Sequence, residues 1–255
     1  PRKRAQRMRW INYAVLAVVV VLLVLFMDGR QLQQVFFRPD MIARTVGPDL
    51  LNALKNTILY TIGAFVFGLV LGTVLALMKL SQIRPYRWLA TIYTEFFRGV
   101  PAIIVLLAFS LLPLAIPGLQ IPLEPFGAVW TALGLVSAAY MSETIRAGVL
   151  AVPKGQTEAA RSLGMPSGMA TQRIVLPQAF RIALPPYGNT LVMMLKDSSL
   201  VSTITVAEMT RQGQLIASST FQNMTVYTLV ALLYLLMSLP LVVQETARQL
   251  ETEPP

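Results

Sequence analysis

The stretch PKGQTEAARSLGMPSGMATQRIVLP, residues 153–177, has the composition of two short helices joined at a corner. Residues 157–163 favour a helix, and Gly164 offers the left-handed conformation that ends one. Pro166 prevents the first helix from continuing and suits the first turn of a second short helix, which we expect to end before Pro177. The small side chains of the first helix would let the surface of another protein approach closely.

Long apolar runs flank this segment and indicate a chain that crosses a lipid bilayer. A crossing helix needs about 20 predominantly apolar residues. The stretches 182–195 and 198–207 are each too short, and they form one crossing only when joined across Lys196 and Asp197. We expect six crossings, within residues 10–27, 57–78, 99–123, 125–142, 182–207 and 212–244.

Prolines modify two of these crossings. Pro113, with further prolines behind it, is expected to end the third helix around Leu112 and leave a short outer loop. Pro185 and Pro186 are expected to kink or break the fifth helix. Such a bend suits a switching site as well as a purely structural corner.

The composition supports a membrane protein and excludes several functions. The chain of 255 residues is 55% hydrophobic and 13% charged, whereas soluble domains carry about 25% charged residues. It has neither histidine nor cysteine, so it lacks the usual general base and thiolate metal ligands. No phosphate-binding Gly-x-x-x-x-Gly-Lys-Ser/Thr string occurs. We therefore expect an all-α integral membrane protein that is no enzyme, binds no metal or cofactor itself and, despite its charge of +9, binds no nucleic acid.

Lysine and arginine placement predicts the orientation of the chain. With six crossings and the N-terminus inside, thirteen of the 21 basic residues fall in inner segments and four in outer ones. Both termini and residues 151–180 should then be cytoplasmic. The first crossing follows a basic stretch as a signal peptide does, but no small-residue cleavage site follows it, so we interpret it as a retained helix.

Small residues recur at every fourth position of the second crossing: Ala64, Gly68, Gly72 and Ala76. This spacing lets another helix approach closely in lipid. The partner helix belongs either to the same chain or to a second subunit.

The quoted loop resembles the EAA loop of ABC importer permeases. The matching positions are Glu158, Ala159, Ala160, Gly164, Ile174, Leu176 and Pro177. In that family the short helix inserts into a groove on the ATP-binding subunit and transmits its closure to the transmembrane helices. The resemblance implies a coupling role for these residues and for Leu163.

Other segments are similar to the polar amino acid branch of this family, namely residues 96–101, 143–148, 152–156 and 195–202. The resemblance implies the type I ABC importer transmembrane fold. It divides the chain into a basic tail, accessory helix and outer loop at 1–49, a five-helix permease domain at 50–245 with its coupling loop at 151–178, and a cytoplasmic tail at 246–255.

The resemblance also implies a function and partners. The chain would be the permease subunit of an ATP-driven polar amino acid importer in the bacterial cytoplasmic membrane. Two ATP-binding cassette subunits would carry ATP and Mg²⁺, and an extracytoplasmic amino-acid-binding protein would deliver the solute. A second permease subunit, identical or homologous, would complete the path. The particular amino acid and the role of the first helix stay open. The alternatives are an ion-coupled secondary transporter, which should show an internal repeat, and a non-transporting assembly protein.

Charged residues within the crossings are candidates for the substrate pathway. A charge inside lipid costs roughly 2.5–3.5 kcal/mol, so it needs a partner or a polar cavity. Lys196 and Asp197 point about 100° apart on a helix, so each needs its own partner, and they either line or brace the path. The hydroxyls of Ser198 and Ser199 could bind a zwitterion or bond back to their own helix.

Two further pairs, Glu95 with Arg98 and Glu143 with Arg146, have the spacing of an ion pair on one helix face. Each pair is either a solvated surface pair or part of a gate. The full set of candidate pathway residues is Glu95, Arg98, Glu143, Arg146, Lys196, Asp197, Ser198 and Ser199.

Overall fold

Every regular element that the computed structural model describes, over residues 2–26 and 28–252, is a helix. The α-helices are α1 (Arg2–Phe26), α2 (Gly29–Phe36), α3 (Pro39–Thr45), α4 (Pro48–Leu80), α5 (Arg84–Gly99), α6 (Ala102–Ala115), α7 (Phe126–Ala151), α8 (Lys154–Ser162), α9 (Ser167–Ala170), α10 (Leu176–Asp197), α11 (Met209–Thr220) and α12 (Asn223–Thr252). A π-helical turn, η1 (Thr171–Val175), joins α9 to α10, and a 3₁₀ helix, η2 (Ser198–Ile204), follows α10. The all-α prediction is confirmed.

The pair of α4 and α7 forms the centre of the fold, where the stripe of small residues on α4 faces α7. A Cβ atom on Gly68 would lie 2.0 Å from Ser137 Oγ. One on Gly72 would lie 2.9 Å from Met141 Cβ and 3.0 Å from the Ala138 carbonyl oxygen. The stripe therefore packs within the same chain, as one of the two interpretations predicted, and leaves no room there for a second subunit.

Replacing Gly72 with alanine is expected to lower the free energy of unfolding. Overpacking a well-filled interface costs about 1–3 kcal/mol, and the better helix propensity of alanine returns about 0.5–1 kcal/mol. The matched control is Gly155→Ala on α8, where an added Cβ has nothing within 4 Å. Thermal unfolding in detergent should show a lower midpoint for Gly72→Ala only, and equal midpoints would contradict the packing described here.

Several of the membrane-length elements are bent helix pairs. By length and composition, α4 and residues Asn223–Pro240 of α12 can each cross a bilayer unaided. Three bent pairs add further candidates: α5 with α6 at 103°, α7 with α8 at 58°, and Ser167–Ile204 with α11 at 51°. The described residues thus hold up to five spans, with a shorter apolar stretch at Met8–Leu22. The count of six crossings stays a prediction.

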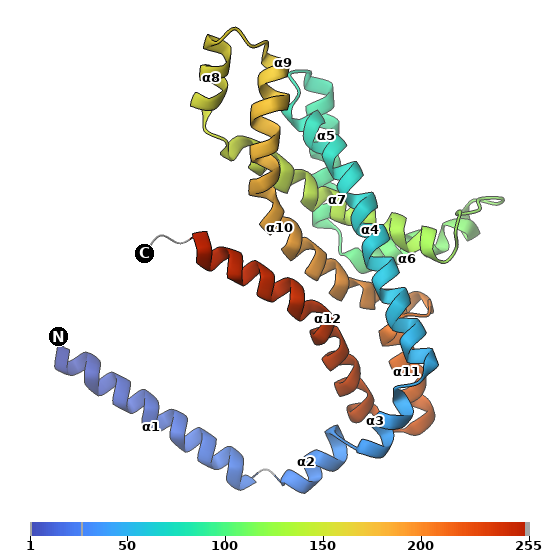
Figure 1. Ribbon diagram of the computed structural model, residues 1–255. Coiled ribbons are helices and arrows are strands. Elements are labelled where there is room, and N and C mark those ends of the chain that lie inside the picture. The colour runs from blue at the N-terminus through green and yellow to red at the C-terminus, as the bar shows by residue number, and fades with distance from the viewer. Residues whose placement is uncertain (1, 27, 253–255) are drawn as a thin grey trace.

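The loop between α7 and α10 forms the predicted corner but continues differently afterwards. Helix α8 ends before Gly164, whose φ of +82° is left-handed, as predicted. The second helix does not end before Pro177; it continues through η1 directly into α10. The wider π turn relieves the clash that the Pro177 ring would have with the carbonyl one α-turn earlier. Figure 1 shows α8 and α9 at the opposite end of the molecule from α3 and α11.

Prolines interrupt the other helices less than the sequence suggested. Helix α6 runs to Ala115 with Pro113 inside it, so its predicted end around Leu112 is wrong by about one turn. A proline this close to the end of a helix removes only one interior hydrogen bond. Pro185 and Pro186 lie inside α10, which is not broken, although Figure 1 shows it changing direction along its length.

The segment before α4 is helical and partly attached to α12. Thr225 of α12 donates a hydrogen bond to the Val35 carbonyl oxygen at 2.8 Å, which holds α2 against α12. A hydrogen bond from Arg38 lowers the pKa of the Asp40 carboxyl below its usual range.

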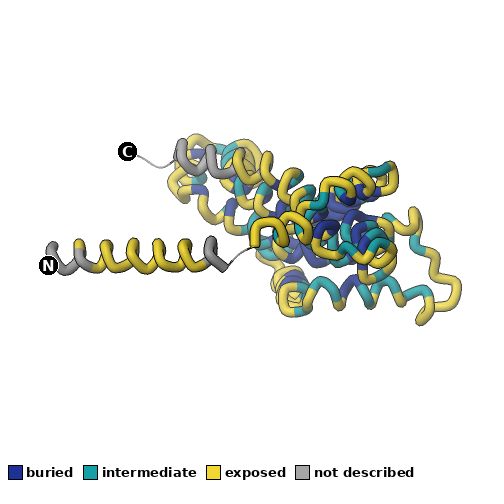
Figure 2. Tube along the Cα trace, turned by 90° about the horizontal axis from the view of Figure 1, so that it is seen from below, coloured by how far each residue is buried: buried dark blue, intermediate teal, exposed yellow. Residues whose placement is uncertain are grey.

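Helix α1 stands apart from the rest, and its central residues are exposed on every face (Figure 2).

Candidate functional site

Helix α8 ends in a rigid cap that exposes a leucine. The Gly164 amide donates to the Arg161 carbonyl at 2.9 Å, and the Met165 amide donates to the Ala160 carbonyl at 3.1 Å. These two bonds form a Schellman motif, which requires the left-handed glycine. The motif turns the chain sharply and leaves Leu163 85% exposed.

The predicted coupling residues divide into an exposed set and an anchoring set. Ala160 is 2% exposed and fixes α8 against its own chain. Glu158, Ala159, Leu163 and Gly164 are exposed and form what we call the α8 surface. Of the positions near the π turn, Leu176 and Pro177 are exposed and Ile174 is half-buried. One alanine of the pair therefore packs inward, and the other remains free for a partner.

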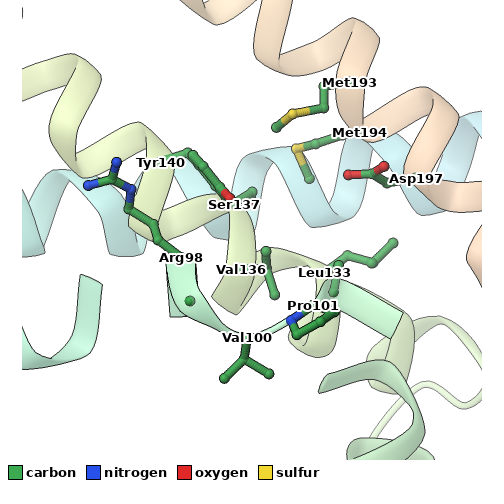
Figure 3. Close-up of a pocket in the computed structure, with 12 residues that line it drawn as sticks. Arg98, Val100, Pro101, Leu133, Val136, Ser137, Tyr140, Met193, Met194 and Asp197 are labelled. Atoms are coloured by element: carbon green, nitrogen blue, oxygen red, sulfur yellow. The ribbon is translucent and has the colours of Figure 1, made fainter. Parts of the chain in front are cut away.

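A cavity of about 280 Å³ lies between α5, α6, α7 and α10. We call it the Asp197 cavity. Its lining residues are Arg98, Gly99, Val100, Pro101, Ala102, Leu133, Val136, Ser137, Tyr140, Met193, Met194 and Asp197. Figure 3 shows the Asp197 carboxylate at one end and the Arg98 guanidinium at the other, beyond Tyr140. The cavity thus combines an apolar wall with one group of each charge.

The break between α5 and α6 shapes one wall of this cavity. The two helices meet at 103°, and Val100 and Pro101 form the corner. Proline has no amide hydrogen and disfavours the helical conformation of the residue before it, so α5 ends there. The same corner places Arg98 in the last turn of α5, at the edge of the cavity.

A second cavity of about 500 Å³ adjoins the first, and we call it the Glu143 cavity. Its lining residues are Arg98, Tyr140, Glu143, Thr144, Pro185, Pro186, Asn189, Thr190 and Met193. Arg98, Tyr140 and Met193 line both cavities. The Arg98 guanidinium carbon lies 5.9 Å from the centre of the Tyr140 ring, within range of a cation–π interaction.

Three charged residues form a network beside the Glu143 cavity. Lys79 of α4 donates hydrogen bonds to Glu143 and to Thr94 of α5. Arg146 Nη2 lies 2.8 Å from Glu143 Oε2, so the predicted pair of Glu143 and Arg146 forms and gains a third member. The Lys79 side chain is only 7% exposed, and the Glu143 carboxylate is its partner in an ion pair. The network joins α4, α5 and α7.

The pair of Glu95 and Arg98 is much looser. Its closest nitrogen and oxygen atoms lie 3.8 Å apart, and the side chains are 66% and 43% exposed, respectively. Glu95 and Arg146 line neither of the two cavities. This arrangement matches the interpretation of a solvated pair for Glu95, while Arg98 faces both cavities.

Lys196 and Asp197 face different spaces, as their angular separation predicted. Lys196 and Ser199 line a third cavity of about 400 Å³ together with Tyr234 and Ser238 of α12. Within the described part of the chain, neither charge forms an ion pair. Ser198 is fully buried and its hydroxyl donates to the Leu195 carbonyl oxygen at 2.7 Å, so it faces its own helix.

A sequence profile described as "Binding-protein-dependent transport system inner membrane component" matches residues 68–246, more than half of the chain. The chain belongs to this family. The profile begins within α4 and spans the α8 surface and both cavities, which agrees with the resemblance that the EAA loop indicated.

Relatives and a solved structure agree with this family. The permease is 38% identical over 196 residues to the L-cystine transport system permease protein TcyB of Bacillus subtilis, covering 76% of this chain and 82% of that protein. It is 36% identical over 191 residues to the probable glutamine ABC transporter permease protein GlnM of the same species, covering 75% and 87%. A crystal structure described as an amino acid ABC transporter with histidines has a TM-score of 0.74 and 36% identity, covering 83% and 97%. The type I importer permease fold is confirmed.

Several functional candidates in this permease were not found from the sequence. Tyr140 and Met193 lie within apolar runs, and Lys79 lies at the end of one. The sequence pattern therefore gave no reason to place them beside Arg98 or Glu143. The one available signal was the helical spacing of Tyr140, three residues before Glu143 and on the same face.

A buried carboxylate also escaped notice. Glu208 has no exposed surface and caps α11 by accepting hydrogen bonds from the Thr210 and Arg211 amides at 2.8 and 2.6 Å. The Tyr234 hydroxyl of α12 donates to the same carboxylate at 2.9 Å. Glu208 therefore ties the bend between η2 and α11 to α12. An acidic residue just before a helix is the signal that could have revealed it.

Proposed function

We propose that this chain is the membrane-spanning permease subunit of an ATP-driven importer of polar amino acids. The observation that carries the proposal is the α8 surface, which displays Leu163 and Glu158 on a capped helix while Ala160 holds that helix to its own chain. A short helix that presents an apolar side chain can dock into a hydrophobic groove of a partner. Two relatives are named as a cystine permease and a probable glutamine permease, and these names support polar amino acids as the solute class.

The partners follow from this role. ATP and Mg²⁺ would bind to two separate ATP-binding subunits that dock on the α8 surface. An extracytoplasmic binding protein would deliver the solute, in keeping with the family's description. A second permease subunit would stand beside this one in the bacterial cytoplasmic membrane, with both termini on the cytoplasmic side. The position of α8 opposite α3 and α11 supports this orientation (Figure 1).

The solute path in this proposal runs through the Asp197 and Glu143 cavities. An amino acid carries an ammonium and a carboxylate, and Asp197 and Arg98 offer one complementary charge for each. The apolar wall near Met193 and Met194 leaves room for a side chain. Lys196 of α10 and Ser199 of η2 line the third cavity and would contribute from there.

The complete complex tests the proposal directly. The chain is purified with its native partners, reconstituted in liposomes and supplied with ATP, the binding protein and a panel of radiolabelled polar amino acids. We expect a stoichiometric ATPase to copurify and at least one amino acid to accumulate only with ATP. Accumulation driven by an ion gradient without ATP would contradict the proposal and favour a secondary transporter.

Asp197→Asn is expected to raise the KM for uptake at least about 10-fold. A hydrogen bond to a charged group contributes about 1.5–3 kcal/mol, and 1.4 kcal/mol corresponds to a factor of ten. The amide keeps the size of the side chain, so the complex should assemble normally. Asp49→Asn is the control, because Asp49 is exposed in the first turn of α4 and lines neither cavity. An unchanged KM in Asp197→Asn would remove this carboxylate from the path.

A further inference from the structure

The two adjoining cavities share one wall, and three helices build it. Arg98 comes from the end of α5, Tyr140 from the middle of α7 and Met193 from α10. In Figure 3 the Tyr140 side chain lies between the Arg98 guanidinium and the Asp197 carboxylate. These three side chains therefore border both the Asp197 cavity and the Glu143 cavity.

The two cavities differ in their free charge. No cation of the described chain pairs with Asp197, so its carboxylate remains available to a solute's ammonium group. The Glu143 carboxylate is already neutralised by Lys79 and Arg146. A zwitterionic solute would therefore be held in the Asp197 cavity and released from the Glu143 cavity, where hydroxyl and amide groups such as Thr190 and Asn189 replace the free carboxylate.

We propose that Arg98, Tyr140 and Met193 form an internal gate between a cavity that holds the amino acid and a cavity that releases it. The proposal rests on the transport function proposed above and adds the residues that separate its two stages. The guanidinium against the Tyr140 ring is the closed contact, held by a cation–π interaction across 5.9 Å.

The side chains of the wall are suited to move. Methionine and arginine are long and unbranched, so they change rotamer at little cost compared with branched side chains. Arg98 also lies in the last turn of α5, just before the break at Val100 and Pro101, where the helix direction changes by 103°. The break between α5 and α6 therefore lies beside one of the three gate residues, Arg98.

Helix α10 connects the gate to the α8 surface. The helical run Ser167–Ile204 begins within the coupling loop and carries both Met193 and Asp197. Pro185 and Pro186 lie between the loop and Met193 and remove two backbone donors from α10. A tilt of α10 that carries its second half along would shift Met193 relative to Arg98 of α5 and Tyr140 of α7.

Leakage through the reconstituted complex tests the gate. Liposomes are loaded with the transported amino acid, and its efflux is followed without ATP. Tyr140→Ala should raise this efflux at least about 10-fold, whereas Tyr140→Phe should keep it low because the ring remains. Tyr227→Ala is the matched control, since Tyr227 is exposed on α12 and lines neither cavity. Efflux at the wild-type rate from a correctly assembled Tyr140→Ala complex would overturn the gate.

A cross-linking experiment keeps the proposal testable if Tyr140→Ala fails to fold. The chain has no cysteine, so Arg98→Cys with Met193→Cys introduces a unique pair of thiols into this subunit. A cleavable bifunctional thiol reagent should block ATP-driven uptake in the double variant, and reductant should restore it. Neither single variant should show this reversible block. Full uptake with the cross-link in place would overturn the gate.

The outcomes separate the gate from the transport function. If the wild-type complex accumulates an amino acid with ATP, the transport function stands and the efflux and cross-linking results decide on the gate alone. If the wild-type complex accumulates none of the panel, the transport function fails and the gate fails with it.

Discussion

Replacing Leu163 with glutamate is expected to lower ATP-driven uptake at least about 30-fold. The leucine is 85% exposed at the capped end of α8, where the proposed ATPase groove would enclose it. An apolar anchor in a protein interface contributes about 2 kcal/mol or more, and each 1.4 kcal/mol is a factor of ten. A carboxylate there would also be desolvated on docking. The measurement is uptake in liposomes together with copurification of the ATPase.

The controls for this variant come from the same loop. Leu163→Met keeps an apolar side chain of similar size, and uptake should stay within a few-fold of wild type. Met169→Glu places the same charge on the exposed surface of the neighbouring α9, outside the predicted coupling residues. Equal losses in Met169→Glu and Leu163→Glu would mean that the loop is merely sensitive to charge and that Leu163 is no anchor.

Glu143→Gln is expected to lower the free energy of unfolding by about 3–5 kcal/mol, because it leaves a buried charge without its partner. Lys79 is 7% exposed and donates to this carboxylate. For a chain of this length the midpoint of thermal unfolding should fall by roughly 6–20 °C. Differential scanning of the purified protein in detergent measures the shift.

Glu95→Gln is the matched control for this prediction. Glu95 also belongs to a Glu–Arg pair three residues apart. Both side chains of this pair are exposed, however, and the closest nitrogen and oxygen atoms lie 3.8 Å apart. Exposed pairs contribute only about 0–1 kcal/mol, so the midpoint should hardly change. Similar shifts in the two variants would show that the buried lysine does not depend on Glu143.

The sequence predicted the coupling loop more fully than any other part of the molecule. Gly164 and Pro166 are local signals that act on their own backbone, so the corner after α8 followed from them directly. The predicted end of the second loop helix before Pro177 is wrong. The chain widens into the π turn η1 and continues as α10, with Pro177 in its first turn. Whether a helix ends at a proline or widens by one residue depends on packing around it, and here Val175 is buried against Val152 and Ala179.

The candidate pathway was predicted only in part. Arg98, Asp197 and Glu143 were found because charges within apolar runs are conspicuous. Tyr140, Met193 and Lys79 were not, since tyrosine, methionine and a lysine at a helix end are ordinary in a membrane protein. For Ser198 the sequence left two possibilities, a bond to a zwitterion or a bond to its own helix, and its hydroxyl donates to the Leu195 carbonyl oxygen. The direction of a side chain depends on which neighbouring helix covers it.

What the amino-acid sequence by itself determined is the class of molecule: a helical membrane protein with a helical corner at Gly164, because hydropathy, charge placement and glycine or proline signals act over a few neighbouring residues. The tertiary structure alone decided which distant residues meet. Gly72 faces Met141, Lys79 reaches Glu143, and Arg98 covers Tyr140. These contacts join helices α4, α5 and α7 across long sequence separations, where close packing in three dimensions selects the partners.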